Sequence, residues 1–133
     1  MRLWHYELIN DLPNEQLIAQ WKVLNTIYKN EPKHILINYI YDYPKEYLYT
    51  FSKIVINEMK RRNIKIHSYE NFNNYFRDLD FDKIDKTVMH IFKEHNNDYY
   101  MICSFALYEK FLRGQKEFNS SLKIIFEKLR KEE

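Results

Sequence analysis

The sequence predicts an all-α fold, and three observations carry this prediction. One glycine and three prolines in 133 residues leave few turn-forming residues, which favours helices over a many-turned β fold. Apolar residues recur at spacings of three and four along several segments. The hydrophobic share of 45% and the aromatic share of 17% are ample for a packed core. Residues 1–133 are therefore expected to form a single compact helical domain of about five or six helices.

The first long helix is predicted from about Asn14 to Lys29, entered from an extended N-terminal arm. Its apolar stripe recurs at spacings of four, three and four and consists of Leu17, Trp21, Leu24 and Tyr28. Pro32 marks its end, because the residue before a proline disfavours helix. Residues 34–41 are β-branched and aromatic without a clean period, so a short helix and a short strand both remain open.

The second long helix is predicted to start around Pro44, because proline is well tolerated in a first turn, and Asp42 is expected to cap it or to lie just before the cap. It leads into Lys60-Arg61-Arg62, and its stripe consists of Tyr47, Leu48, Phe51, Ile54, Val55 and Met59. After a short link, the spacing of Phe72, Tyr75 and Phe76 beyond Ser68 suggests another helical turn or two.

The second half of the chain is predicted to hold three further helices. Residues 84–92 have helical apolar spacing, and Asn96-Asn97 is expected to stop that helix. Asp98 is expected to cap the next helix, which Gly114 terminates. A last helix is expected around residues 122–129.

Composition also bounds the class of protein. Cys103 is the single cysteine, which excludes an internal disulfide and a multi-cysteine metal site, and no cofactor or metal is expected. No apolar run approaches the roughly 20 residues needed to span a bilayer, and no signal peptide is recognisable, so a cytoplasmic protein is expected. The formal charge of +2 is only mildly basic, less than a protein that grips duplex DNA through phosphates usually carries.

Several short segments together form a pattern that points to one family. They are residues 1–22, Pro32-Lys33-His34-Ile35-Leu36-Ile37-Asn38, Asp42-Tyr43-Pro44 and Glu58-Met59-Lys60-Arg61-Arg62, with a looser fit at His95-Asn96-Asn97 and at Tyr99 through Lys110. In this combination the chain resembles the pyrimidine-dimer DNA glycosylases, well over its first half and weakly over its second. The resemblance implies an endonuclease V-like helical fold and double-stranded DNA, damaged or abasic, as the partner.

The resemblance also implies where the chemistry lies. In this family the N-terminal amine attacks the sugar C1′ and forms a Schiff base, and a glutamate of the first helix assists base departure and β-elimination. A free α-amine has in general a pKa near 8, so it can attack C1′ without elaborate activation. Arg2 is expected to hinder methionine removal, so the amine here lies on Met1. In an ungapped comparison the glutamate position is occupied by Val23, which cannot move a proton.

The candidate site residues follow from the resemblance. The catalytic candidates are Met1 as nucleophile and Glu7 of the arm as a substitute acid, and the DNA-binding candidates are Arg2, Lys22, Lys33, His34, Arg61 and Arg62. Each has a structural interpretation as well: Glu7 fits a solvated arm residue, His34 a hydrogen-bonded histidine, and the basic run at residues 60–62 a helix end whose charge complements the macrodipole. Trp21 and Cys103 fit core positions, whereas Trp4 fits either the core or a base-stacking role.

Three functions remain open at the level of sequence. The first is a DNA glycosylase and abasic-site lyase that acts through the N-terminal amine. The second is a DNA-binding protein that keeps the fold and has lost catalysis with the glutamate, as Val23 suggests. The third is a helical protein-interaction module, which the near-neutral charge favours.

Overall fold

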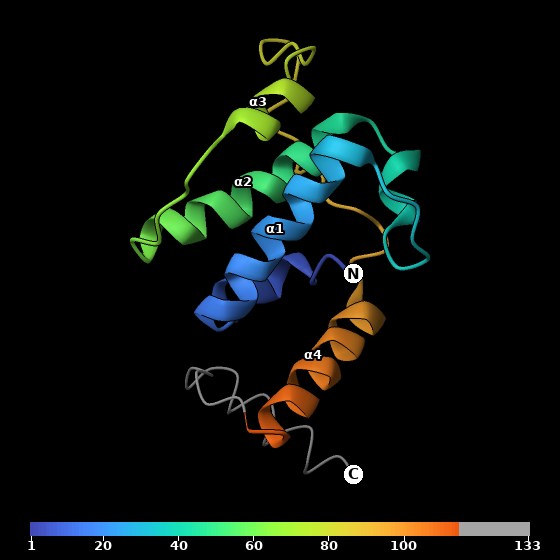
Figure 1. The fold of residues 1–133 in the computed structure, drawn as a ribbon. Coiled ribbons are helices and arrows are strands. Elements are labelled where there is room, and N and C mark those ends of the chain that lie inside the picture. The colour runs from blue at the N-terminus through green and yellow to red at the C-terminus, as the bar shows by residue number, and fades with distance from the viewer. Residues whose placement is uncertain (115–133) are drawn as a thin grey trace.

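The computed structural model describes residues 1–114, and over this range it contains helices and no strand (Figure 1). In chain order the elements are η1 (Tyr6–Asp11), α1 (Asn14–Asn30), η2 (Asn38–Asp42), α2 (Lys45–Arg61), α3 (Glu70–Tyr75) and α4 (Asn97–Leu112), where η marks a 3₁₀ helix. The all-α prediction is confirmed. The helix expected around residues 122–129 lies outside the described residues.

The core forms where α1 packs against α2 on one side and α3 on another (Figure 1). The predicted stripe of α1 is buried in full, and so are Phe51, Val55 and Met59 of α2. Trp21 and Cys103 occupy the core positions that the sequence predicted, and Trp4 joins them with 7% of its surface exposed. Residues 34–41 contain the start of the short 3₁₀ helix η2, which decides between the helix and the strand left open above.

The N-terminal arm is more ordered than the extended segment that the sequence predicts. Leu3, Trp4 and His5 are buried, and residues 6–11 then form the 3₁₀ helix η1. The His5 Nδ1 atom accepts a hydrogen bond from the backbone N–H of Glu7, 3.1 Å away, which caps this helix. Residues 3–5 of the arm are thus part of the packed interior.

The helix predicted over residues 84–92 is absent, and this segment consists of a short turn, bends and irregular backbone. The physical reason is that aspartates in and before it bond to the backbone and compete with helix: Asp80 Oδ1 accepts from the N–H of Asp82, and Asp85 Oδ1 accepts from the N–H of Thr87. Val88 is 50% exposed and Met89 is 71% exposed, so the apolar spacing here does not reflect a buried face.

The predicted cap of α4 is wrong, and the cap of α2 lies two residues after Asp42. Asn96 caps α4 through its side chain, which accepts from the N–H of Tyr99, so residues 96–97 begin a helix where the sequence suggested an end, and Asp98 lies inside the first turn. Asp42 belongs to η2, and Pro44 occupies the cap position of α2 without a side-chain bond. In the part of the chain that the structure describes, no helix is long and apolar enough to cross a membrane.

Candidate active site

A buried glutamine of α1 holds the N-terminal arm in place. Gln20 is 1% exposed, and its Oε1 accepts from the backbone N–H of Trp4 at 2.7 Å while its Nε2 donates to the carbonyl of Arg2 at 3.0 Å. From the other side, the Tyr99 hydroxyl of α4 donates to the carbonyl of Leu3. The backbone one residue after Met1 is therefore fixed between α1 and α4, and Met1 itself remains 42% exposed.

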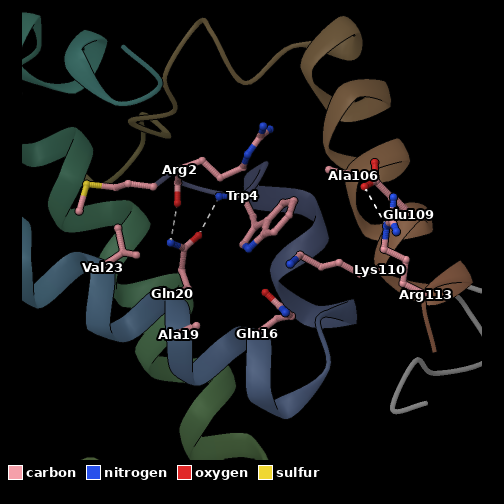
Figure 2. Close-up of a pocket in the computed structure, with 11 residues that line it drawn as sticks. Arg2, Trp4, Gln16, Ala19, Gln20, Val23, Ala106, Glu109, Lys110 and Arg113 are labelled. Carbon is pink, nitrogen blue, oxygen red and sulfur yellow. Dashed lines mark hydrogen bonds and ion pairs between the residues drawn. The ribbon is translucent and has the colours of Figure 1, made fainter. Parts of the chain in front are cut away.

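Met1 borders a pocket of ≈ 470 Å³ whose walls are the arm, α1 and α4 (Figure 2). The described residues that line it are Met1, Arg2 and Trp4 of the arm; Gln16, Ala19, Gln20 and Val23 of α1; and Ala106, Glu109, Lys110 and Arg113 at the end of α4. The figure shows α4 on the far side of the pocket from α1. The first 23 residues and the end of α4, which are far apart in the sequence, therefore form one pocket.

Val23 lies on the α1 wall of this pocket and is half-buried. Met1 lines the same pocket, so Val23, the position where the resemblance predicts a glutamate, shares a cavity with the first residue of the chain. The neighbouring Lys22 is exposed and lines a different pocket of ≈ 460 Å³, together with Lys65 and His67. Consecutive helical residues point about 100° apart, which explains why positions 22 and 23 face different surfaces.

The pocket at Met1 carries an excess of positive charge. Arg2, Lys110 and Arg113 line it, and Glu109 is the one acidic residue among the described lining residues. Glu109 is itself paired with Arg113, whose Nε lies 3.2 Å from its Oε1. A cavity with several cations and one carboxylate favours an anionic ligand, and a phosphodiester fits that requirement.

The other predicted site residues lie outside this pocket. Glu7, the substitute acid of the sequence analysis, does not line it, and its carboxylate accepts from the Tyr6 hydroxyl at 2.9 Å. Lys33 and His34 lie in the link between α1 and η2, where the Lys33 ammonium is 4.3 Å from the centre of the Tyr41 ring. The backbone N–H of Leu36 donates to His34 Nδ1 at 3.2 Å. Contact of Lys33 and His34 with DNA stays a prediction.

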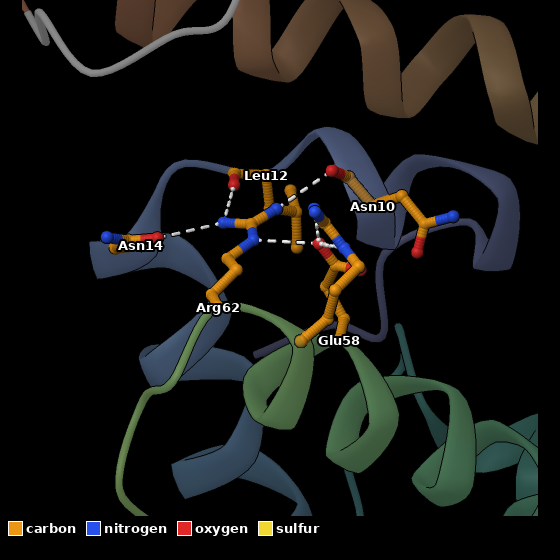
Figure 3. A network of polar contacts seen from close by, with 6 residues as sticks. Asn10, Leu12, Asn14, Glu58 and Arg62 are labelled. Carbon is orange, nitrogen blue, oxygen red and sulfur yellow. Dashed lines mark hydrogen bonds and ion pairs between the residues drawn. The ribbon is translucent and has the colours of Figure 1, made fainter.

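The guanidinium of Arg62 forms hydrogen bonds to groups within the protein (Figure 3). It is 14% exposed, and its Nε donates to Glu58 at 2.8 Å. Its Nη1 donates to the Leu12 carbonyl and, at 3.0 Å, to Asn14 Oδ1, while its Nη2 donates to the Asn10 carbonyl at 2.8 Å. Arg62 thus joins the end of α2 to the turn between η1 and α1 and supports the arm that presents Met1.

Arg61, the neighbouring basic candidate, is 66% exposed and also bonds to Glu58. Burial alone would raise the pKa of Glu58, but the hydrogen bonds and charges of Arg61 and Arg62 outweigh burial and hold that pKa below its ordinary value. Of the two arginines, Arg61 is the one whose exposure leaves it accessible to a phosphate.

The two arginines make a matched test of this division. We expect Arg62→Ala to lower the free energy of unfolding by about 2–3 kcal/mol, because the buried Glu58 loses one of its two arginine partners and the Leu12 carbonyl loses its donor. Arg61→Ala should change stability far less and weaken DNA binding more. Urea unfolding and duplex binding, measured for both variants, check this; a larger stability loss for Arg61→Ala would contradict it.

The sequence analysis missed a buried histidine pair that consists of His5 of the arm and His95. His95 Nδ1 accepts from the backbone N–H of Tyr6 at 3.2 Å, so in the neutral ring its Nε2 carries the proton and donates to the Tyr39 hydroxyl at 2.7 Å. The His5 ring stacks on His95 with centroids 5.5 Å apart. Burial, and then the neighbouring His5, lower the pKa of His95 to about 3.

The α4 wall of the pocket was missed as well. Ala106, Glu109, Lys110 and Arg113 have the spacing of one helix face, which is visible in the sequence. Nothing in that spacing says that the face lies opposite Met1, because the two are brought together by contacts more than 90 residues apart, such as Tyr99 to Leu3. In residues 1–114 no group of three or more histidine, cysteine or acidic side chains is placed to hold a metal ion.

Comparison with known families identifies the family to which this chain belongs. The family model described as pyrimidine dimer DNA glycosylase matches residues 1–70, which is more than half of the chain. The chain belongs to the pyrimidine dimer DNA glycosylase family. Comparison with curated proteins and with solved structures gives no match. The family segment covers the arm, α1 and α2, whereas the α4 wall of the pocket lies beyond it.

Proposed function

We propose that this protein is a cytoplasmic DNA-repair protein whose Met1 α-amine forms a Schiff base with the sugar C1′ at damaged or abasic sites in duplex DNA. The observation that carries the proposal is the shared pocket: Met1 and Val23 line one cation-rich cavity in a chain of this family. Met1, which bears the amine, is exposed, and the carbonyl of the next residue, Arg2, is held by Gln20, so a reactive amine at this position is both accessible and oriented.

Abasic sites are the substrate that this pocket fits most directly. The ring-opened abasic sugar carries an aldehyde at C1′, to which a neutral amine adds; loss of water then gives the imine, so no base has to depart. Excision of an intact damaged base also requires stabilisation of the departing base and of the sugar cation. Val23 offers neither, because its side chain is apolar. The lyase reaction is therefore the stronger of the two expected activities.

The cations around the pocket support DNA as the partner. Arg2, Lys110 and Arg113 line the pocket, where we expect them to bind the phosphates that flank a distorted nucleotide, and Lys22 and Lys65 add positive charge beside α1. Such contacts position the backbone without reading sequence, which suits an enzyme that responds to damage.

Reductive trapping tests the proposal. With borohydride present, the protein and a duplex that contains one abasic site should form a covalent adduct, because reduction converts the imine into a stable amine. N-terminally acetylated protein should give no adduct. Lys110→Arg is the matched control, since it removes the other primary amine that lines the pocket while keeping its charge, and its adduct yield should stay near that of the wild type.

Duplex binding, measured in the same preparations, separates the possible failures. Binding without any adduct from the unmodified protein would contradict the proposed chemistry and favour a DNA-binding homologue that lacks catalysis. The absence of both would favour a helical interaction module instead.

A further inference from the structure

Among the described residues that line the pocket at Met1, one side chain is suited to accept a proton. Of the described lining residues, Arg2, Lys110 and Arg113 carry donors and no free acceptor, and Trp4 offers only an N–H. Gln16 and Gln20 carry amides, which are very weak bases. Glu109 has a carboxylate, and general bases in enzymes are commonly carboxylates or imidazoles.

The chemistry proposed for Met1 requires such a base. Once the imine has formed at C1′, strand cleavage proceeds by β-elimination, in which a proton leaves C2′ and the C3′–O3′ bond breaks. The Met1 nitrogen is consumed in the imine and cannot take that proton. A separate acceptor on the pocket wall is therefore needed for rapid cleavage.

Glu109 lies on a wall that is fixed relative to Met1. The helix α4 contacts η1, and two bonds hold its N-terminal end to the arm: Tyr99 donates to the Leu3 carbonyl, and the N–H of Tyr6 donates to His95. Figure 2 shows Glu109 on α4 and Val23 on α1, on opposite sides of the pocket. A sugar bound between these walls meets the apolar Val23 side chain on one side and the Glu109 carboxylate on the other.

We propose that Glu109 is the base that removes the C2′ proton after the Met1 imine has formed, an assignment that rests on the proposed function of this pocket. The carboxylate takes the proton, the C2′–H electron pair becomes the C2′=C3′ double bond, and the C3′–O3′ pair leaves with the phosphate. No oxidant, reductant or metal takes part. Arg113 holds the carboxylate at 3.2 Å and also offers a cation near the departing phosphate.

Glu109 lies outside the segment of the chain that matches the family. Residues 1–70 match the family, and in this chain they place no carboxylate among the described residues that line the pocket. The acidic group comes from α4, about 40 residues beyond the matched segment. The base would thus be supplied from a different helix than the one that carries Val23.

Glu109→Gln in the full chain tests the assignment, because glutamine keeps the shape and removes the basicity. Two readouts are compared on a duplex with one abasic site: the yield of borohydride-trapped adduct and the rate of strand cleavage. We expect the adduct yield to stay within about twofold of the wild type and the cleavage rate to fall at least about tenfold. Glu15→Gln is the matched control, an exposed carboxylate of α1 that does not line the pocket, and it should change neither readout.

The outcomes are distinguishable. Unchanged cleavage by Glu109→Gln alongside normal trapping would overturn the role of Glu109 and leave the Met1 chemistry intact. An equal loss of trapping and cleavage would assign Glu109 to binding or folding and would also overturn the proposal. Failure of the wild-type protein to trap any adduct would overturn the proposed function and this inference together.

Discussion

Val23→Glu should raise the rate at which this protein excises a damaged base from duplex DNA by about 10²–10⁴-fold, the usual contribution of general acid–base assistance. Val23 lines the pocket that Met1 borders, so the new carboxylate would reach the space where the amine attacks C1′. There it could stabilise the sugar cation as the base departs. Val23 is half-buried and faces a cavity of ≈ 470 Å³, so the longer side chain has room without displacing the core.

Release of free damaged base from a duplex that contains one pyrimidine dimer measures this effect. Thr26→Glu is the matched control, because it adds the same carboxylate about one turn away on α1, at a position that does not line the pocket. A folded Val23→Glu variant with no gain over Thr26→Glu would show that the pocket does not accept the lesion in the expected register.

Acidification should destabilise the protein through the buried histidine pair. The pKa of His95 is about 3 in the folded protein and near 6.5 when unfolded, and burial also lowers the pKa of His5. Between these values the unfolded chain binds more protons than the folded one, so this stabilisation is fully present above about pH 6.5 and is lost as the pH falls toward 3. For His95 alone the loss is about 1.4 kcal/mol per pH unit, or about 2 kcal/mol by about pH 5.

The loss has a direct structural consequence for the arm. A proton on His95 Nδ1 would remove the acceptor for the Tyr6 N–H and place charge beside His5, so the arm that presents Met1 should loosen first. His95→Asn keeps an acceptor for that N–H and removes the titration. Urea unfolding at about pH 7 and about pH 5 should show a smaller loss for His95→Asn than for the wild type. Equal losses in both proteins would contradict the account.

Local pattern was sufficient for the parts of the fold that obey a simple period. The stripe from Leu17 to Tyr28 predicted α1 to within a residue or two, because a buried helix face repeats every three to four residues. The same logic gave a wrong helix over residues 84–92. There, side-chain bonds from Asp80 and Asp85 to nearby backbone N–H groups stabilise turns, and this competition does not show in apolar spacing.

Of the candidate site, only the residues within the segment that resembles the family could be predicted. Met1 and Val23 follow from the resemblance of the first 22 residues and meet at one pocket. Glu109 and the histidine pair depend on where α4 docks, through contacts such as Tyr39 with His95, 56 residues apart. The resemblance made Arg62 a DNA-binding candidate, and the structure shows its guanidinium bonded to groups within the protein, which the sequence pattern does not reveal.

The central claim is that the Met1 α-amine is the nucleophile, and peptide mapping of the borohydride-reduced adduct tests it most directly. Proteolysis and mass spectrometry of the adduct formed with abasic-site DNA should place the reduced sugar on the peptide that begins with Met1, at its α-nitrogen. Lys110 is the informative competitor, because it lines the same pocket and carries a primary amine. An adduct located on Lys110, or spread over several surface lysines, would contradict the account.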